Sequence, residues 1–356
     1  MELTDKDFER ILIIKPSSCG DIIHALPVLH GLRVRFPKAR IRWLVAAPFV
    51  ELVDEHPDLD EIIPFDRKRF GRLGRSLRVN YEFMHFVRAL RAKRFDLVID
   101  LQGLFRSAFL SLASGAKVRV GFANAREFAW AFYTHRVSIP DMETHAADRN
   151  YRVADLLAFA HVPMEMRLPV KTESARSLTE KLREAGLAEN EPYALLVPCA
   201  RWETKIWPAD RFAQVADALD HRFGLRSVLI GSPDEAPVTA KVMAAGPPGT
   251  VDLAAKTTLG EMVAAVDHAR LVVCNDSGPM HVAAALDRPL VAVFGPTSHV
   301  RTGPYHRLAS VVRTSLDCSP CYLKKITQCP YHHRCIEELS VERVLAAVAK
   351  ALGGDP

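Results

Sequence analysis

The sequence predicts an α/β protein made of two successive series of alternating strands and helices. Short apolar runs such as residues 11–14 and 290–294 lack polar alternation, which is typical of strands buried on both faces of a parallel sheet. Segments with helical periodicity follow most of these runs. A charged stretch with several prolines at residues 162–192 separates the two series, so we place a domain junction there.

The first series is predicted to form one domain, residues 1–165. In the helix that follows its first strand, Ile22, Leu26 and Leu29 fall on successive turns. Strands are predicted at residues 11–14, 41–46, 61–65, 96–101 and 118–120, and helices at 22–36, 48–55, 81–93, 104–114 and 144–160.

The second series is predicted to form a domain at residues 193–338, after a linker region at 166–192 and before a C-terminal helical segment at 339–356. Phe212, Val215 and Leu219 share one face of its first helix. Strands are predicted at residues 193–197, 226–230, 271–274 and 290–294, and helices at 178–184, 209–223, 235–245, 259–269 and 341–352.

Composition indicates a globular cytoplasmic protein. The 356 residues are 49% hydrophobic and 25% charged, and the length suits two domains. No apolar run approaches the roughly 18 residues that cross a bilayer, and the acidic, polar N-terminus is unlike a signal peptide. The net charge of +5 is mild, and a single basic loop with little aromatic interleaving is weak evidence for nucleic-acid binding.

The stretch 271–297 gives the strongest indication of a binding site. Its two apolar runs flank the turn NDSG at 275–278, and Pro279 suits the first position of a following helix. The N-terminus of that helix would lie at the carboxyl end of a strand, where open α/β sheets bind anions such as a pyrophosphate. The turn at 295–297 ends the next strand on the same side. The alternative is an ordinary βαβ unit with a capped helix.

Charged residues follow other predicted strands. Asp21 is either the N-cap of the next helix or a carboxylate that can accept a proton. Lys205 precedes a helix and is either a phosphate ligand or a solvated lysine. Asp234 and Glu235 occupy a similar turn, where they either bind ribose hydroxyls or cap the helix.

A basic segment lies in the first series. It is either a solvated loop or a docking site for a phosphorylated or carboxylated partner, because guanidinium groups match such anions. Asp66 is its only acid, and its cations are Arg67, Lys68, Arg69, Arg72, Arg75 and Arg78.

Four of the seven cysteines are clustered near the C-terminus, with the spacing Cys-x2-Cys-x7-Cys-x5-Cys. This spacing is compatible with a structural zinc site, to which His332 or His333 could contribute; the alternative is free thiols or facultative disulfides. The four are Cys318, Cys321, Cys329 and Cys335.

Several motifs together resemble the family 9 glycosyltransferases, the ADP-heptose:lipopolysaccharide heptosyltransferases, and most of all heptosyltransferase I. The resemblance covers nearly the whole chain. The motifs are KPSSCGDIIHALPVL (15–29), the KIWP block (205–208), NDSGPMHVAAALDRPLVAVFGPT (275–297), DRKRFGR (66–72), DLQGLFRSA (100–108) and AREFAWAFY (125–133).

The resemblance implies the GT-B architecture, in which two Rossmann-like α/β/α domains face each other across a cleft. It also implies an inverting, metal-independent transfer of heptose from ADP-heptose, with Asp21 as the catalytic base. The donor-binding residues that it implies are Lys205, Asp276, Ser277, Gly278 and His281, to which we add Asp234 and Glu235.

The resemblance further implies an acceptor in the lipopolysaccharide inner core, Kdo on lipid A. The enzyme would then be a cytoplasmic monomer, peripherally associated with the inner membrane. Acceptor-binding residues are expected at Ser18, Arg67, Lys68, Arg69, Arg72 and Arg126.

Two departures from the family pattern concern specificity. The family's threonine-rich loop before the lysine is here PCARWET, residues 198–204, and the best-known heptosyltransferase I has no Cys cluster. A heptosyltransferase II-like enzyme with another acceptor or donor is therefore the first alternative, and a nucleotide-sugar epimerase of GT-B fold is the second. A non-catalytic binding module would be indifferent to Asp21. An NAD-dependent oxidoreductase would need a glycine-rich fingerprint after the first strand, which the sequence lacks.

Overall fold

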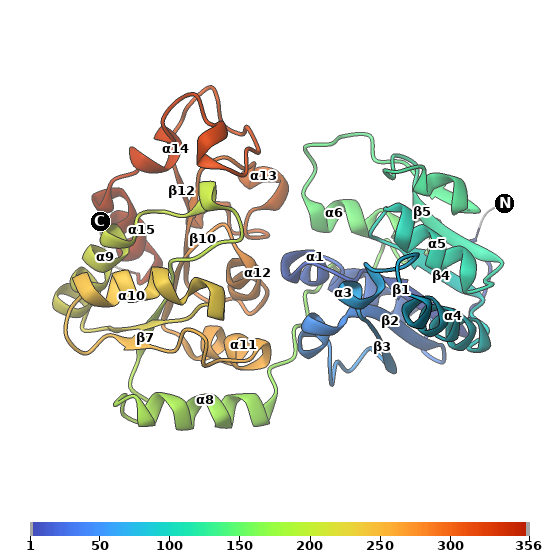
Figure 1. Ribbon diagram of the computed structural model, residues 1–356, viewed down its shortest axis with the longest axis horizontal. Helices are drawn as coiled ribbons and strands as arrows, with labels where there is room; N and C mark the ends of the chain where they lie inside the picture. The colour runs from blue at the N-terminus through green and yellow to red at the C-terminus, as the bar shows by residue number, and fades with distance from the viewer. Residues whose placement is uncertain (1–2, 354–356) are drawn as a thin grey trace. The chain divides into compact units, whose positions relative to one another are not determined.

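The computed structural model describes residues 3–353, and the chain divides into two compact units, Met1–Pro169 and Val170–Pro356. Each unit contains a six-stranded, wholly parallel sheet with helices packed around it (Figure 1). The predicted α/β class is therefore confirmed in both halves of the chain.

The sheet of the first unit has the order β3-β2-β1-β4-β5-β6. The order reverses between the neighbours β1 and β4, so the loops after these two strands lie at the topological switch point where such sheets bind ligands. The strands are β1 (Arg10–Ile14), β2 (Arg40–Ala46), β3 (Glu61–Phe65), β4 (Leu97–Asp100), β5 (Val118–Phe122) and β6 (His135–Val137).

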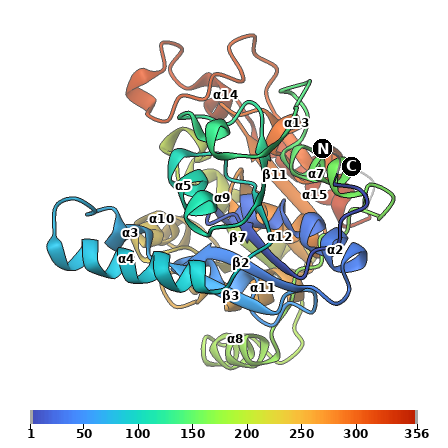
Figure 2. The same cartoon turned by 90° about the vertical axis from the view of Figure 1, so that its right-hand side faces the viewer.

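Helices connect these strands, and α3 contacts α4; both are seen at the left of Figure 2. The α-helices are α1 (Cys19–Ile23), α2 (Leu26–Arg35), α3 (Arg67–Phe70), α4 (Leu77–Ala92), α5 (Phe105–Ala113), α6 (Ala146–Tyr151) and α7 (Val153–Leu157), and the 3-10 helices are η1 (Ala47–Leu52) and η2 (Ala129–Phe132).

The sheet of the second unit has the order β12-β11-β10-β7-β8-β9, which is the same topology with its first strand at β7. Its switch point lies between β7 and β10. The strands are β7 (Tyr193–Val197), β8 (Arg226–Leu229), β9 (Val251–Asp252), β10 (Leu271–Asn275), β11 (Leu290–Phe294) and β12 (Val311–Arg313).

The second unit also contains the helix that follows the junction, α8 (Thr172–Glu184), which packs against α11 (Leu259–His268). The other α-helices are α9 (Ala209–Phe223), α10 (Ala236–Ala245), α12 (Gly278–Ala285), α13 (His299–Thr302), α14 (Arg334–Glu337) and α15 (Val341–Ala351), and the 3-10 helices are η3 (Glu203–Lys205), η4 (Pro233–Glu235), η5 (Leu308–Ser310) and η6 (Ile326–Gln328).

The predicted bounds of β7 and α9 are confirmed, whereas two predicted helices are wrong as single elements. The helix at 22–36 is interrupted between α1 and α2, where Pro27 falls in the first turn of α2. The helix at 144–160 is the pair α6 and α7, and Ala158 ends α7 in the left-handed conformation.

The predicted basic loop is also corrected, because residues 67–70 form α3, which Asp66 caps by accepting a hydrogen bond from the N–H of Arg69. The strands β6, β9 and β12 were not predicted from the sequence. They have only two or three residues each and lie toward the sheet edges, so they carry no apolar run.

Between residues 3 and 353, no helix is both long and apolar enough to cross a bilayer. The apolar side chains are instead buried around the two sheets. In the second unit, Trp207 and Phe212 are fully buried, and the indole N–H of Trp207 donates a hydrogen bond to Leu339 O at 3.0 Å. This contact joins the start of α9 to the segment that precedes α15.

A buried carboxylate, Glu261 of α11, links α8 to the rest of the second unit. Its side chain is only 4% exposed, and Lys181 of α8 approaches Oε1 at 2.5 Å and Oε2 at 2.7 Å. The hydroxyl of Ser177 donates to Oε1 at 2.6 Å, and the N–H of Thr258 donates to Oε2 at 2.7 Å. Burial alone would raise the pKa of Glu261, but these donors outweigh burial and lower the pKa.

We expect Glu261→Ala to lower the free energy of unfolding by about 3 kcal/mol, because it leaves Lys181 without its carboxylate and removes a helix cap. The matched control is Glu180→Ala, which removes the exposed Arg176–Glu180 pair of α8, the helix that carries Lys181, and should change stability by less than about 0.5 kcal/mol. Urea unfolding of both variants measures the difference. Equal effects would contradict this assignment.

Candidate functional site

Asp21 lies in the first turn of α1, directly after β1. Its Oδ2 accepts hydrogen bonds from the N–H and the hydroxyl of Ser18, both at 2.9 Å, in a capping box. Lys15 Nζ lies 3.3 Å from Oδ1. The Lys15 side chain is 8% exposed, whereas that of Asp21 is 43% exposed. Ser18 is therefore the N-cap of α1, and the predicted N-cap role of Asp21 is wrong. Asp21 is the third residue of the helix, where it accepts hydrogen bonds from the N-cap and still presents its carboxylate to the surface.

The electrostatic surroundings keep this carboxylate ionised. Partial burial acts to raise the pKa of Asp21, but the positive charge of Lys15 and the hydrogen bonds from Ser18 have the larger combined effect. The pKa of Asp21 consequently lies below its usual value.

A second carboxylate, Asp100, ends the neighbouring strand β4 in register with Ile14 of β1. It is fully buried, and the hydroxyl of Tyr133 donates a hydrogen bond to its Oδ2 at 2.8 Å. Burial raises the pKa of Asp100, although its hydrogen bonds oppose this effect. A Cβ at Gly121 would lie 2.3 Å from the Tyr133 ring, so only glycine fits beside this tyrosine.

Sequence reasoning did not assign a role to Lys15 or Asp100. Lys15 directly follows one predicted strand, and Asp100 lies at the carboxyl end of another. The carboxyl ends of adjacent parallel strands lie side by side. Lys15 Nζ donates to Leu101 O at 2.9 Å, which ties the loop after β1 to the loop after β4. The position of both residues at the ends of apolar runs was the signal available in the sequence.

The predicted acceptor-binding cations lie on two segments of the first unit. Arg67 reaches the loop after β1, where its Nη1 donates to Ser17 Oγ at 3.3 Å. Arg69 instead pairs with Glu82 of α4. Lys68, Arg72 and Arg126 are exposed. Of the predicted cations, Arg67 is therefore the one that a hydrogen bond connects to the segment preceding Asp21.

The second unit brings three turns together around Asp276, which is 5% exposed. Lys205, at the end of η3, places its Nζ 2.6 Å from Asp276 Oδ2. The hydroxyl of Thr297 donates to the same oxygen at 2.5 Å. These residues follow β7, β10 and β11, so one buried carboxylate connects the carboxyl ends of three strands. The sequence predicted Lys205 and Asp276 as site residues, but it assigned no role to Thr297.

The turn after β10 also holds polar atoms that lack a partner in the described chain. The N-cap residue of α12 is Ser277, and its hydroxyl oxygen is buried without a hydrogen bond among residues 3–353. The side-chain nitrogen Nδ2 of Asn275 is also buried without a hydrogen bond in this range, while its Oδ1 accepts a hydrogen bond from the N–H of Trp207 at 3.1 Å. Gly278 begins α12, and His281 is buried in its first turns. A buried hydroxyl at a helix N-terminus suits an anionic ligand.

The two acids after β8 have different environments. Glu235 Oε2 accepts a hydrogen bond from the N–H of Ser232 at 2.8 Å, as the predicted capping alternative requires. Asp234 is exposed in the same 3-10 helix.

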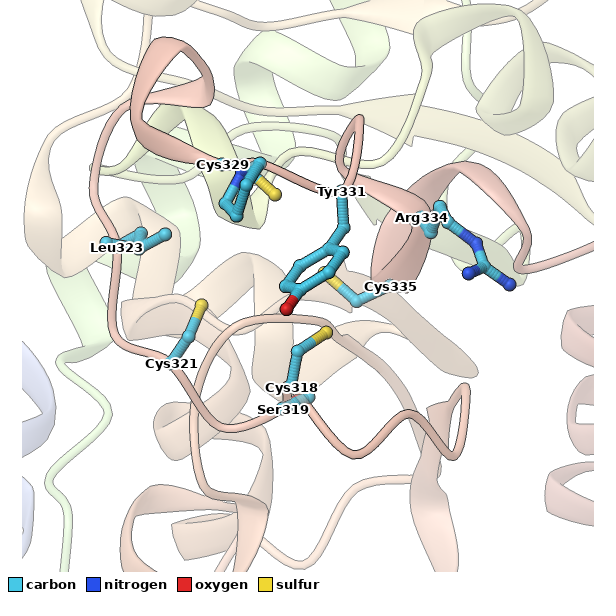
Figure 3. A pocket seen from close by; sticks show the side chains of 9 residues that line it. Cys318, Ser319, Cys321, Leu323, Cys329, Tyr331, Arg334 and Cys335 are labelled. Atoms are coloured by element: carbon cyan, nitrogen blue, oxygen red, sulfur yellow. The ribbon is translucent and has the colours of Figure 1, made fainter.

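The clustered cysteines line a cavity of about 190 Å³ in the second unit. Figure 3 shows the Tyr331 ring among their sulfurs and the Arg334 side chain directed away. All seven cysteines are free thiols. Burial, assisted by the three neighbouring thiols, raises the pKa of Cys335 to about 11. Within residues 3–353, no group of three or more His, Cys, Asp or Glu side chains is arranged to hold a metal ion. The predicted zinc thus gains no support from this geometry and stays a prediction.

The fold and the two sets of residues define a class of protein. Two doubly wound units, each with polar residues at its switch point, form the GT-B architecture of nucleotide-sugar glycosyltransferases.

Comparison with known proteins identifies the family. The family model of glycosyltransferase family 9 (heptosyltransferase) matches residues 83–332. Lipopolysaccharide heptosyltransferase 1 of Pseudomonas aeruginosa is 31% identical over 325 residues, covering 90% of this chain and 88% of the relative. Lipopolysaccharide heptosyltransferase 1 of Escherichia coli K12 is 31% identical over 309 residues, covering 85% and 93%. The chain therefore belongs to glycosyltransferase family 9 and is a glycosyltransferase.

Solved structures agree with this assignment. Heptosyltransferase II of E. coli superposes with a TM-score of 0.78 at 26% identity, covering 96% of this chain and 98% of its own. An E. coli heptosyltransferase with ADP superposes with a TM-score of 0.77 at 26% identity, covering 96% and 99%.

We expect Thr297→Val to lower the free energy of unfolding by about 1–3 kcal/mol, because it removes one donor from the buried Asp276 without changing the size of the side chain. Thr297→Ser retains the hydroxyl and should keep most of this stability. Urea unfolding of the unliganded protein compares the two variants. If valine and serine behave alike, the hydrogen bond to Asp276 is not what Thr297 contributes.

Proposed function

We propose that the protein transfers a heptose, with inversion, from ADP-heptose to the inner core of lipopolysaccharide. The observation that carries this proposal is the Lys205–Asp276–Thr297 cluster beside the unpartnered Ser277 hydroxyl, in the second unit. Support for the donor comes from two solved E. coli relatives, one with ADP and one with ADP-2-deoxy-2-fluoro heptose. Support for the acceptor class comes from the names of the curated relatives.

The donor is assigned to the second unit. Lys205 and the N-terminus of α12 at Ser277 and Gly278 complement the diphosphate, and a phosphate oxygen would satisfy the buried Ser277 hydroxyl. His281 lies on the same helix. Asp234 is assigned to the ribose hydroxyls, with Glu235 beside it at the same turn.

The chemical step is assigned to Asp21. The acceptor hydroxyl oxygen forms a bond to the anomeric carbon as the bond from that carbon to the diphosphate oxygen breaks on the opposite face. The hydroxyl proton passes to the Asp21 carboxylate, and the electron pair of the broken bond leaves with ADP. Lys205 and the amides of α12 stabilise the charge that builds on the diphosphate; such oriented donors contribute several kcal/mol in many enzymes. No step in this scheme requires a metal ion.

The acceptor is assigned to the cations of the first unit. Arg67, Lys68, Arg69, Arg72 and Arg126 would bind the carboxylate and phosphate groups of Kdo-lipid A, with Ser18 beside them. The same cations would favour an anionic membrane surface at about 1 kcal/mol each. We therefore propose peripheral association with the inner membrane, and we expect the enzyme to be a cytoplasmic monomer.

A heptosyltransferase II-like reaction is the main alternative, and its observation is the structural match to E. coli heptosyltransferase II. Mass spectrometry of products from ADP-heptose with either Kdo-lipid A or heptosylated Kdo-lipid A distinguishes the two. Product from the first acceptor alone supports the proposal, and product from the second alone supports the alternative. Family membership does not favour an epimerase.

We expect Asp21→Asn to reduce the transfer rate at least 100-fold, because an amide cannot accept the acceptor proton. The substitution retains an oxygen for the hydrogen bonds from Ser18, so folding should persist. Calorimetric titration with ADP serves as the control and should give a dissociation constant within twofold of the wild-type value. A variant that transfers heptose at a near wild-type rate would refute the role of Asp21.

The pH dependence of transfer should reveal the Lys15–Asp21 pair. Lys15→Met removes the cation whose charge lowers the pKa of Asp21, so this pKa should rise. Because only the ionised carboxylate accepts a proton, the acid limb of kcat/KM should move to higher pH. Lys38→Met, an exposed substitution, should leave the limb in place. An unmoved limb in a folded Lys15→Met protein would contradict the pairing.

A further inference from the structure

The segment 318–335, which we call the Cys-rich segment, is hydrogen-bonded to the turn that holds Thr297. The hydroxyl of Ser319 donates to Gly295 O at 2.6 Å. The N–H groups of Cys321 and Tyr322 donate to Pro296 O at 3.1 and 2.8 Å. The first part of the segment therefore lies against the turn after β11.

The next part of the Cys-rich segment is hydrogen-bonded to the turn that holds Lys205. The hydroxyl of Thr204 donates to Leu323 O at 2.7 Å, and the N–H of Ile326 donates to Glu203 Oε1 at 2.6 Å. His333 Nε2 lies 2.6 Å from Thr204 O. The segment thus joins two of the three turns that meet at Asp276.

Lys324 lies between these anchors, because Leu323 before it and Ile326 beyond it are both bonded to the turn at 203–205. Its Nζ lies 5.0 Å from the centroid of the Trp202 ring, and Lys205 Nζ lies 4.6 Å from the same centroid. One indole ring therefore contacts both ammonium groups, which places Lys324 and Lys205 beside the same side chain.

The two lysines differ in their charge balance. Lys205 is paired with Asp276 at 2.6 Å, so this pair has no net charge. Lys324 is exposed, and within residues 3–353 no carboxylate oxygen lies within 4.0 Å of its Nζ. A nucleoside diphosphate carries at least two negative charges, which the Lys205–Asp276 pair does not balance. A second cation at this place supplies the missing positive charge.

We propose that Lys324 is a second diphosphate-binding residue of the donor site and that the Cys-rich segment positions it there. The inference rests on the proposed donor site at Lys205 and extends it to a residue from a distant part of the chain. Lys324 binds the diphosphate before transfer and supports the negative charge on ADP as it leaves.

Calorimetric titration with ADP and with adenosine tests this proposal. Lys324→Ala should raise the dissociation constant for ADP about five- to tenfold and leave adenosine binding unchanged, because only the diphosphate meets the lost cation. Lys324→Arg should retain most of the affinity for ADP. The matched control is Lys325→Ala, since Lys325 is the exposed neighbouring lysine and should change the ADP constant less than twofold.

The outcomes separate this inference from the donor assignment. If Lys205→Ala weakens ADP binding and Lys324→Ala does not, the donor site stands and the role of Lys324 is refuted. If Lys325→Ala weakens binding as much as Lys324→Ala, general surface charge explains the effect and the specific role is again refuted. If the folded wild-type protein does not bind ADP, both proposals fail. Thermal unfolding of each variant confirms that it is folded.

Discussion

The buried contact of Asp276 with Lys205 and Thr297 is the constraint on which the second unit depends. Its distances of 2.6 and 2.5 Å join the turns after three different strands. A buried carboxylate is costly unless it is paired and hydrogen-bonded, so the fold is favourable only when all three turns adopt this arrangement. The same arrangement places the α12 N-terminus and Lys205 side by side. The stability of the unit and the shape of its proposed diphosphate site therefore share one cause.

The first unit uses two carboxylates at neighbouring strand ends for opposite purposes. Asp100 is fully buried beside the Tyr133 hydroxyl, and its pKa is raised. Asp21 is partly exposed beside Lys15, and its pKa is lowered. Environment alone separates the two groups. Asp100 is held inside the unit by Tyr133, whereas Asp21 stays ionised with its side chain partly exposed.

The sequence predicted those features that local patterns encode. Periodicity and capping residues predicted α9, and an unbroken apolar run predicted β7. Turn chemistry and the following Pro279 predicted a helix N-terminus after β10, and the resemblance to family 9 implied Asp276 as a site residue there. Thr297 was missed because its partner lies 21 positions away and only the parallel register brings them together. Lys324 was missed for the same reason, since nothing in its neighbourhood in the sequence points to Trp202.

The hydrogen bonds between the Cys-rich segment and residues 203–204 also affect the stage of synthesis at which the proposed nucleotide site can form. They connect positions separated by 119 to 129 residues. Synthesis proceeds from the N-terminus, so the ribosome completes Lys205 long before it reaches the residues that hold its turn in place. A nascent chain that ends before Ser319 carries every residue assigned to ADP except Lys324. Its turn after β7 lacks the hydrogen bonds that the Cys-rich segment later provides. Competence for nucleotide binding should therefore appear late in translation, only when the last part of the chain has folded back onto the sheet.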